Sequence, residues 1–419
     1  MLDYMAEALR LAEKGRGTTS PNPMVGCVIV KEGKIVGRGW HERAGEPHAE
    51  RFALREAGKQ AAGATAYVTL EPCNHFGRTP PCSAGLIEAG IREVHVAMMD
   101  PNPIVAGRGI ERLRAAGITV HVGQHEAEAK RLNEVFIHYI TTRRPFVIAK
   151  WAMTIDGRIA THTGHSRWIT GPSARAHTHQ TRHEVDAILV GRGTALADNP
   201  RLTTRLDGIA QNGKQNQVPS HPLRVILDSY GSLPTSLQLF DPTLPGQTLV
   251  ATTERASERW LEQLHEQGVI SVVLPADANG QVPLCALLEE LGRRQVSSLL
   301  VEGGGEIHAS FFAQELVNKV HAYIAPKLVG GRDAPGPLGG IGVATMPEAV
   351  QLTWQEVKPL GQDLLMVAEV SYPIDQASSN MAKSSQESNN LHQTWHHTHT
   401  CKDETVTYQP HNEIEKAYV

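Results

Sequence analysis

The sequence predicts an α/β protein built from two domains and a polar C-terminal tail. As far as Tyr372, short runs rich in β-branched residues alternate with stretches of helical periodicity, which is typical of sheets packed against helices. With 419 residues, the chain is too long for one ordinary hydrophobic core. Residues 376–419 are rich in Ser, Asn, Gln, Thr and His and contain few apolar residues. We therefore expect domains at 1–144 and 145–373 and a disordered tail at 374–419.

The pattern in the first domain predicts a mixed sheet layered between helices. The tripeptide Lys31-Glu32-Gly33 lies between two apolar runs and indicates a hairpin turn. Helices are expected around residues 2–12, 48–58, 83–89, 110–116 and 126–139. Strands are expected at residues 25–30, 34–36, 64–70, 93–98 and 118–122.

The second domain is expected to start with a buried strand at residues 146–150. Polar residues 207–222 show no periodicity and are interpreted as a loop. Helices are expected at 256–267 and 285–293. Further strands are expected at 185–190, 223–227, 248–252, 270–274 and 298–301.

One imidazole, two thiols and one carboxylate form the most informative group of residues in the chain. His48 and Glu50 lie at the start of the predicted helix after Pro47, Cys73 follows a strand, and Cys82 opens a helix. A catalytic zinc ion takes three protein ligands and leaves one position to water, so His48, Cys73 and Cys82 are the candidate ligands. Glu50 is then the candidate general base and acid. A lone His-x-Glu is usually an ordinary helix start, and it is the ordered combination that favours a zinc site.

The spacing departs from one known signature. Zinc deaminases of nucleobases carry H-x-E followed by P-C-x-x-C, in which two residues separate the cysteines. Here His48 and Glu50 match the first half, but eight residues separate Cys73 from Cys82. The motif is therefore a variant of the deaminase signature.

Composition limits the other classes of function. The formal net charge is -4, so no nucleic-acid partner is expected. No apolar run of 18 residues or more suggests a membrane span, and the N-terminus lacks a secretory signal pattern. Cys27, Cys285 and Cys401 are left as free thiols, which fits a cytoplasmic location. The tail histidines His392, His396, His397 and His399, together with Cys401, could bind a metal, but a solvated tail is the favoured interpretation.

Across residues 1 to about 372, the chain resembles the bifunctional deaminase–reductases of riboflavin biosynthesis. The eight-residue gap between the cysteines is that family's own pattern. The resemblance also rests on blocks at residues 21–26, 100–103, 154–158, 166–170, 198–203 and 301–304.

The resemblance implies a cytidine-deaminase-like three-layer domain followed by a dihydrofolate-reductase-like α/β domain. The implied reactions are zinc-dependent hydrolytic deamination of 2,5-diamino-6-(5-phosphoribosylamino)pyrimidin-4(3H)-one and NADPH-dependent reduction of the ribosyl to the ribityl side chain. It also implies one Zn²⁺ per deaminase domain, a phosphorylated pyrimidine substrate, no nucleic-acid or membrane partner, and association into homo-oligomers.

The resemblance further assigns site residues. In the first domain, Asn22 and His41 are expected to contact substrate, and His75, Arg78, Asp100 and Asn102 to hold its ribose phosphate or ring. Proline neighbours Asn22, Asp100 and Asn102, so simple turns are the alternative for these three. In the second domain, the expected NADPH contacts are Ala152, Trp168, Thr194, Asp198, Ser229, Gly304 and Gly305. The expected substrate contacts there are Ser166, Arg182, Leu202, Arg205 and Glu302.

Some of these assignments have competing interpretations. Arg182 and Arg205 suit a phosphate as bidentate donors, although surface arginines are common. Trp168 could equally belong to the core, since large aromatic residues are mostly buried. Lys150 ends the first predicted strand of the second domain and is expected to face the cleft. The glycines at 303–305 do not form a G-x-G-x-x-G fingerprint, because position 308 is histidine.

Two other functions compete with the two-step enzyme. One is a single-activity zinc deaminase of another aminopyrimidine or nucleobase, with a non-catalytic C-terminal binding module. The other is a noncatalytic metal carrier that uses the histidine-rich tail. The cofactor and substrate blocks of the second domain favour the bifunctional enzyme.

Overall fold

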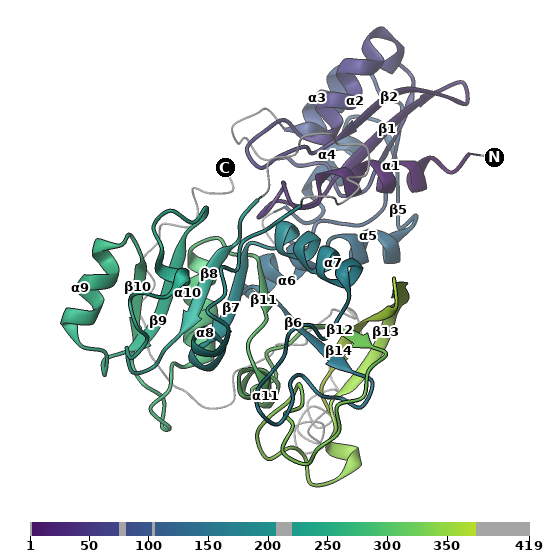
Figure 1. The fold of residues 1–419 in the computed structure, drawn as a ribbon. Coiled ribbons are helices and arrows are strands. Elements are labelled where there is room, and N and C mark those ends of the chain that lie inside the picture. The colour runs from purple at the N-terminus through teal and green to yellow at the C-terminus, as the bar shows by residue number, and fades with distance from the viewer. Residues whose placement is uncertain (1, 75–80, 103–104, 207–219, 374–419) are drawn as a thin grey trace, which may run out of the picture. The chain divides into compact units, whose positions relative to one another are not determined.

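The computed structural model describes residues 2–74, 81–102, 105–206 and 220–373. These residues form two compact units, 2–145 together with 291–297, and 146–290 together with 298–373 (Figure 1). No helix in this part of the chain is both long and apolar enough to span a membrane. The predicted tail at 374–419 lies outside the described residues, as does most of the predicted loop at 207–222.

A five-stranded mixed sheet organises the first unit. Its order is β2-β1-β3-β4-β5, with β1 antiparallel to β2 and β3, and β3, β4 and β5 mutually parallel. The predicted hairpin turn is confirmed, because Glu32 and Gly33 both have positive φ, 50° and 73°. The strands are β1 Gly26–Lys31, β2 Lys34–Trp40, β3 Thr65–Val68, β4 Glu93–Val96 and β5 Thr119–Val122.

Helices cover both faces of this sheet. Strand residues alternate, so Val94 and Val96 pack toward the core that contains α2, α3 and α4. The opposite face packs on a second core that includes Met5 of α1, Ala129 of α5 and Phe136 of α6. The three-layer prediction is therefore confirmed. The helices are α1 Tyr4–Ala12, α2 Ala49–Ala57, α3 Cys82–Glu88, α4 Arg108–Ala115, α5 Glu126–Leu132 and α6 Glu134–Thr142, with 3₁₀ turns η1 Glu13–Gly15 and η2 Gly58–Ala61.

The continuous helix expected at residues 126–139 is wrong, because Asn133 divides it. Its side-chain amide donates to the Met24 carbonyl at 3.0 Å and accepts from the Met24 N–H at 2.8 Å. Asn133 is buried and has φ -105° and ψ 21°, outside the helical region. The Asn133 backbone still bonds to Ala129 and Ile137, so the side-chain pairing with Met24 accompanies a local distortion of the backbone rather than a loss of these bonds.

A nine-stranded sheet organises the second unit. Its order is β10-β9-β8-β7-β11-β6-β12-β14-β13, parallel from β10 to β12 and antiparallel at the last two pairings. The central strands are buried on both faces, as in helix-covered parallel sheets. The strands are β6 Phe146–Thr154, β7 Ala187–Gly191, β8 Leu223–Leu227, β9 Thr248–Thr253, β10 Ile270–Leu274, β11 Ser298–Val301, β12 Lys319–Ala325, β13 Gln351–Leu360 and β14 Asp363–Ser371.

Within the described part of this unit, five helices connect these strands. They are α7 Pro172–Glu184, α8 Arg192–Asp198, α9 Glu258–Glu266, α10 Leu284–Arg293 and α11 Gly305–Ala313, with 3₁₀ turns η3 Gln238–Phe240 and η4 Met346–Glu348 (Figure 1). The α/β class is confirmed, but the six strands expected in this domain omitted β12, β13 and β14. Strand β13 escaped prediction because it is a largely exposed edge strand containing Pro359, without a clean alternation of buried residues.

The free-thiol prediction is confirmed at Cys27, which is buried in β1. It is not tested at Cys285 and Cys401, because a pairing of these two would involve Cys401, which lies outside the described residues.

Candidate active sites

The first two members of the candidate zinc site lie at the start of α2. His48 is the N-cap residue, with extended backbone (φ -75°, ψ 163°) and no side-chain capping bond. Its imidazole is therefore not used to cap the helix and turns toward the two cysteines. Glu50 lies in the first turn of α2 and is only 3% exposed.

The two cysteines come from a loop and a helix start. Cys73 lies in the loop after β3, and Cys82 is the first residue of α3. The Cys82 N–H donates to the Cys73 sulfur at 3.3 Å, and the Ser83 N–H donates to the Cys73 carbonyl at 3.2 Å. The N-terminus of α3 thus fixes the Cys73 loop and favours a thiolate at Cys73.

The three predicted ligands converge in the structure. His48 Nδ1 lies 3.5 Å from Cys73 Sγ and 3.3 Å from Cys82 Sγ. All three ligand atoms lie within 4.8 Å of one another. Zinc–nitrogen and zinc–sulfur bonds in a tetrahedron imply a nitrogen–sulfur separation of about 3.6 Å. The residues therefore fit a zinc ion, through Nδ1 of the imidazole.

Electrostatics at this site favour one thiolate even without a metal. The hydrogen bond from Cys82, together with His48, lowers the pKa of Cys73 to about 4 against the opposing effect of burial. The Cys73 sulfur and burial raise the pKa of Cys82. The pair shares one proton, which a divalent cation would displace.

Glu50 lies next to the three ligands, and one of its two carboxyl oxygens makes no hydrogen bond. Its Oε2 is buried and has no partner, and burial raises the pKa of its carboxyl while nearby His48 lowers it. A buried polar atom without a partner is costly in an ordinary core and is found at functional sites. The carboxyl is therefore placed to exchange a proton with a group bound between the ligands.

His41 lies beside His48, and Asn22 lies beside His41. The His41 ring meets the His48 ring edge-on, with centroids 5.5 Å apart. His41 Nδ1 faces the Pro47 carbonyl at 3.3 Å and Nε2 faces the Asn22 amide nitrogen at 3.4 Å. Burial lowers the pKa of His41 to about 4, so this imidazole is neutral at physiological pH. The structure thus brings both predicted substrate residues to the zinc ligands.

The remaining predicted pocket residues are only partly described. His75 and Arg78 lie outside the described residues. Asp100 Oδ1 accepts the Asn102 N–H at 2.9 Å, which is the geometry of a turn. Burial, with the charges of Glu71 and Cys73 adding to it, raises the pKa of Asp100 to about 6 despite this hydrogen bond. The turn interpretation therefore has geometric support at Asp100.

Glu71 is a buried residue of this region that the sequence did not single out. Its carboxylate accepts four backbone N–H groups, from Asp100 at 3.2 Å, Gly107 at 2.9 Å, Gly109 at 2.9 Å and Ile110 at 3.3 Å. It therefore caps α4 from a distance and ties that helix to the loop that carries Cys73. A Cβ at Gly109 would lie 1.9 Å from the Pro72 carbonyl oxygen, so this contact requires glycine. Only its place two residues before Cys73 could have drawn attention to Glu71.

We expect Glu71→Gln to lower the free energy of unfolding by about 1–3 kcal/mol, because an amide NH₂ would then face backbone donors. Denaturant unfolding at neutral pH measures the change. Glu111→Gln, on the exposed side of α4, is the matched control and should have little effect. Equal stability of Glu71→Gln and the control would contradict this role.

In the second unit, Glu302 forms the centre of a buried ion cluster where β11 ends. Arg182 of α7 donates Nε to Oε1 and Nη2 to Oε2, both at 2.8 Å. Lys150 of β6 lies 3.7 Å from Oε2. The Glu302, Arg182 and Lys150 side chains are only 9%, 13% and 14% exposed. Val301 at the end of β11 pairs with Ala149, so Glu302 lies beside Lys150 in the middle of β6. The strand end predicted at Lys150 is therefore wrong, because β6 continues to Thr154.

In this cluster, the attraction between opposite charges opposes the effect of burial on the pKa values of Glu302 and Lys150. Burial raises the pKa of Glu302, but Arg182 and Lys150 outweigh it and lower that pKa to about 2. Burial lowers the pKa of Lys150, and Glu302 opposes the change. Burial and the neighbouring Arg182 and Arg205 lower the pKa of His179 to about 4. The cluster therefore keeps an anion and two cations beside a neutral imidazole.

Arg182 does not present the free bidentate fork expected of a phosphate ligand. Two of its nitrogens bind Glu302, and Nη1 donates to the Thr203 carbonyl at 3.3 Å. Arg205 is exposed, and its backbone N–H donates to His179 Nδ1 at 3.3 Å. Of the two arginines, Arg205 therefore has the accessible guanidinium.

The glycine turn at 304–305, predicted to contact NADPH, makes contacts with other parts of the protein. Gly304 is the N-cap of α11, and its N–H donates to Thr194 Oγ1 at 3.0 Å. Gly305 lies under the 336–339 segment, where an added Cβ would meet the Gly336 oxygen and the Gly339 nitrogen at 3.0 Å. Thr194 and Gly304 are thus neighbours, and this N–H already has a partner.

Other predicted cofactor residues differ in accessibility. Trp168 is 65% exposed, so its assignment to the core is wrong, and Arg175 lies 4.6 Å above its ring. Asp198 ends α8 and pairs loosely with Arg167 at 3.9 Å. Ser229 is buried, and its hydroxyl donates to Gln281 and accepts the Val282 N–H.

The last three predicted residues lie on β6 and two loops. Ala152 is in β6, in register with Tyr323 of β12. Leu202 is buried and has a positive φ of 51°, unusual for a branched side chain. Ser166 is half-buried in the loop before α7.

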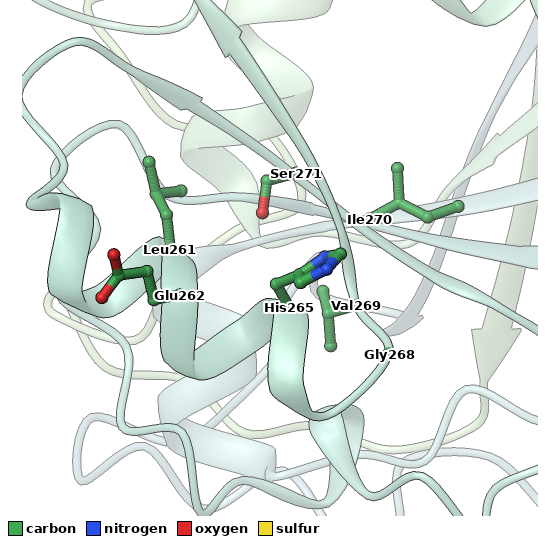
Figure 2. A pocket seen from close by; sticks show the side chains of 7 residues that line it. All are labelled: Leu261, Glu262, His265, Gly268, Val269, Ile270 and Ser271. Atoms are coloured by element: carbon green, nitrogen blue, oxygen red, sulfur yellow. The ribbon is translucent and has the colours of Figure 1, made fainter.

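A surface pocket between α9 and β10 carries none of these residues. Figure 2 shows its lining, in which Glu262 and His265 point in different directions. Strand β10 is the far edge of the nine-stranded sheet, several strands from β11 and β6. The lining residues are Leu261, Glu262, His265, Gly268, Val269, Ile270 and Ser271. This pocket lacks converging polar groups and is not the candidate site.

Comparison with known proteins agrees with both units. Residues 2–98 match the family model of the cytidine and deoxycytidylate deaminase zinc-binding region, and residues 145–366 match the RibD C-terminal domain. A riboflavin biosynthesis protein RibD from Actinobacillus pleuropneumoniae is 48% identical over 89% of this chain and 96% of the relative. The Escherichia coli RibD is 43% identical over 87% of this chain and 97% of its own length.

Solved structures give the same result. Acinetobacter baumannii RibD aligns with a TM-score of 0.78 and 37% identity, covering 88% of this chain and 98% of that one. The Thermotoga maritima diaminohydroxyphosphoribosylaminopyrimidine deaminase/5-amino-6-(5-phosphoribosylamino)uracil reductase aligns with a TM-score of 0.73 and 36% identity, with the same coverage.

The fold, the zinc-type ligand set and these matches define a bifunctional enzyme in which a cytidine-deaminase-like domain is joined to a reductase domain. The chain belongs to the RibD family of riboflavin biosynthesis proteins. The bifunctional expectation and its fold class are confirmed, and a non-catalytic C-terminal module is not supported.

Proposed function

We propose that the first unit deaminates 2,5-diamino-6-(5-phosphoribosylamino)pyrimidin-4(3H)-one, with zinc held by His48, Cys73 and Cys82. The observation that carries this proposal is the convergence of one imidazole and two sulfurs beside the unpartnered carboxyl oxygen of Glu50. Zinc bound there would make a water molecule strongly nucleophilic near neutral pH. The protein's own residues then orient the pyrimidine and move protons.

Glu50 is the proposed proton carrier. It takes a proton from the attacking water and delivers it to the amine that leaves as ammonia, so it ends the reaction in its starting state. Its burial excludes bulk water from the exchange. Asn22 and His41 are the proposed contacts to the pyrimidine, because the His41 ring meets the His48 ring edge-on and Asn22 faces His41.

For the second unit, we propose reduction of the ribosyl to the ribityl side chain. NADPH would supply the hydride, since protein side chains cannot donate one. The proposed cofactor contacts are Ala152, Trp168, Thr194, Asp198, Ser229, Gly304 and Gly305, of which exposed Trp168 offers the most accessible flat surface. Arg205 is the proposed phosphate contact, Glu302 and Arg182 would orient the ribose, and Ser166 and Leu202 complete the substrate contacts.

The proposal includes the domain limits 1–144, 145–373 and 374–419. It also includes a cytoplasmic location, because ligand thiolates need a reducing compartment to stay unpaired. Association of copies stays a prediction.

We expect Cys73→Ala to abolish zinc binding at the first site and ammonia release from the diaminopyrimidine. Metal analysis of the purified chain and an ammonia assay measure both effects, with a chelator-treated sample alongside. Cys27→Ala is the matched control, since Cys27 is a buried free thiol. Undiminished ammonia release in a metal-free Cys73→Ala sample would refute the proposed site.

Reduction is tested separately. The full chain receives the deaminated product and NADPH, and the loss of reduced-nicotinamide absorbance is followed. We expect oxidation of NADPH in the parent chain and in Cys73→Ala. No oxidation in the parent chain would overturn the reductase half alone.

A further inference from the structure

A second group of metal-type donors lies on the first unit, away from the zinc ligands. Glu93 and His95 are two residues apart on β4, so their side chains share one face of the sheet. His121 of β5 is directly in register with His95. Their neighbours Val94, Val96 and Val120 pack into the core on the α2 and α3 side. The three donors therefore occupy the opposite face, where α1 and α5 lie.

The donor atoms converge on one carboxylate oxygen. His95 Nε2 and His121 Nε2 each lie 3.1 Å from Glu93 Oε1. One ligand atom from each of the three residues lies within 4.8 Å of the others. The two imidazoles stack with centroids 4.7 Å apart and planes inclined by 23°. Two aligned nitrogens and one oxygen thus point to one spot.

Surrounding side chains hold this arrangement in place. Tyr67 of β3 stacks on the other face of His95, with centroids 4.6 Å apart and planes inclined by 11°. Tyr4 of α1 packs on Tyr67, and its hydroxyl donates to the Gly33 carbonyl. The Thr65 hydroxyl donates to the second Glu93 oxygen at 3.4 Å. Three adjacent strands therefore orient the donors before any ligand arrives.

The donor set matches a definite class of ligand. Two imidazoles and one carboxylate suit Zn²⁺, Ni²⁺ and Cu²⁺, whereas Mg²⁺ and Ca²⁺ prefer oxygen ligands alone. The Glu93, His95 and His121 side chains are 27%, 21% and 53% exposed, so water could complete the coordination. We propose that Glu93, His95 and His121 form a second binding site for a divalent transition-metal ion.

The test is Ni²⁺ titration of the zinc-loaded full chain by calorimetry, with Ni²⁺ itself as the probe. We expect the parent chain to bind one equivalent of Ni²⁺ at this site. The double variant His95→Asn/His121→Asn should lose this equivalent or bind it at least about ten-fold more weakly. His396→Asn/His397→Asn is the matched control for the histidine-rich tail and should keep that equivalent. Identical stoichiometry and affinity in the parent chain and His95→Asn/His121→Asn would overturn the proposal.

A second variant separates metal binding from simple hydrogen bonding. Glu93→Gln keeps a hydrogen-bond acceptor for the two imidazoles but removes the anionic ligand. We expect it to unfold at the same temperature as the parent without Ni²⁺ and to lose the Ni²⁺-induced rise in unfolding temperature. If Ni²⁺ raises the unfolding temperature equally in both, the cluster is a hydrogen-bonded surface group and the proposal fails.

Discussion

Glu50→Gln will keep its zinc and lose deamination by about two to four orders of magnitude. Glutamine has nearly the same shape, so the 3% exposed position tolerates it without a cavity. It cannot accept and release a proton, whereas the three ligands are untouched. Metal analysis and the initial rate of ammonia release measure the two effects.

Two controls make this result specific. Glu56→Gln changes an exposed carboxylate on the same helix and should leave deamination unchanged. NADPH oxidation with supplied deaminated substrate should survive Glu50→Gln, because Lys150, Arg182 and Glu302 are unaltered. Deamination at the parent rate in Glu50→Gln would mean that another group moves the proton.

The second large effect is expected from Glu302→Gln. The change leaves Arg182 and Lys150 facing each other in a largely buried cluster without their anion. Removing one partner of a buried ion pair costs about 3–5 kcal/mol. We expect a loss of unfolding free energy of that order at neutral pH, together with loss of reduction. Denaturant unfolding measures the first effect, and NADPH oxidation measures the second.

The same change predicts a pH dependence with a definite sign. The pKa of Glu302 is about 2 in the folded chain against an ordinary 4.5, so the unfolded chain binds the proton more tightly. This carboxylate therefore stabilises the fold fully above pH 4.5, and the contribution declines as pH falls toward 2. The stability difference between parent and Glu302→Gln should be constant near neutrality and shrink below pH 4.5. Glu369→Gln, exposed on β14, should show no such difference.

Local pattern predicted much of the fold. Hairpin β1–β2, helix α2 and the central parallel strands follow from a turn tripeptide, helix-start chemistry and continuous apolar runs, each within a short window. Strand β13 did not follow, because an exposed edge strand has no buried face to impose alternation. The break at Asn133 did not follow either, because it accompanies a pairing with the Met24 backbone more than 100 residues away.

The sequence by itself identified the candidate zinc ligands and Glu50, because a metal site needs particular side chains and short motifs carry them. Only the tertiary structure decided what Glu71, Glu302 and the His95–His121 pair contact. Their partners lie on other strands and helices, and a carboxylate or imidazole has no local pattern that reveals a distant partner. The sequence states which chemical groups the chain carries, whereas only the folded sheets determine which of these groups come together.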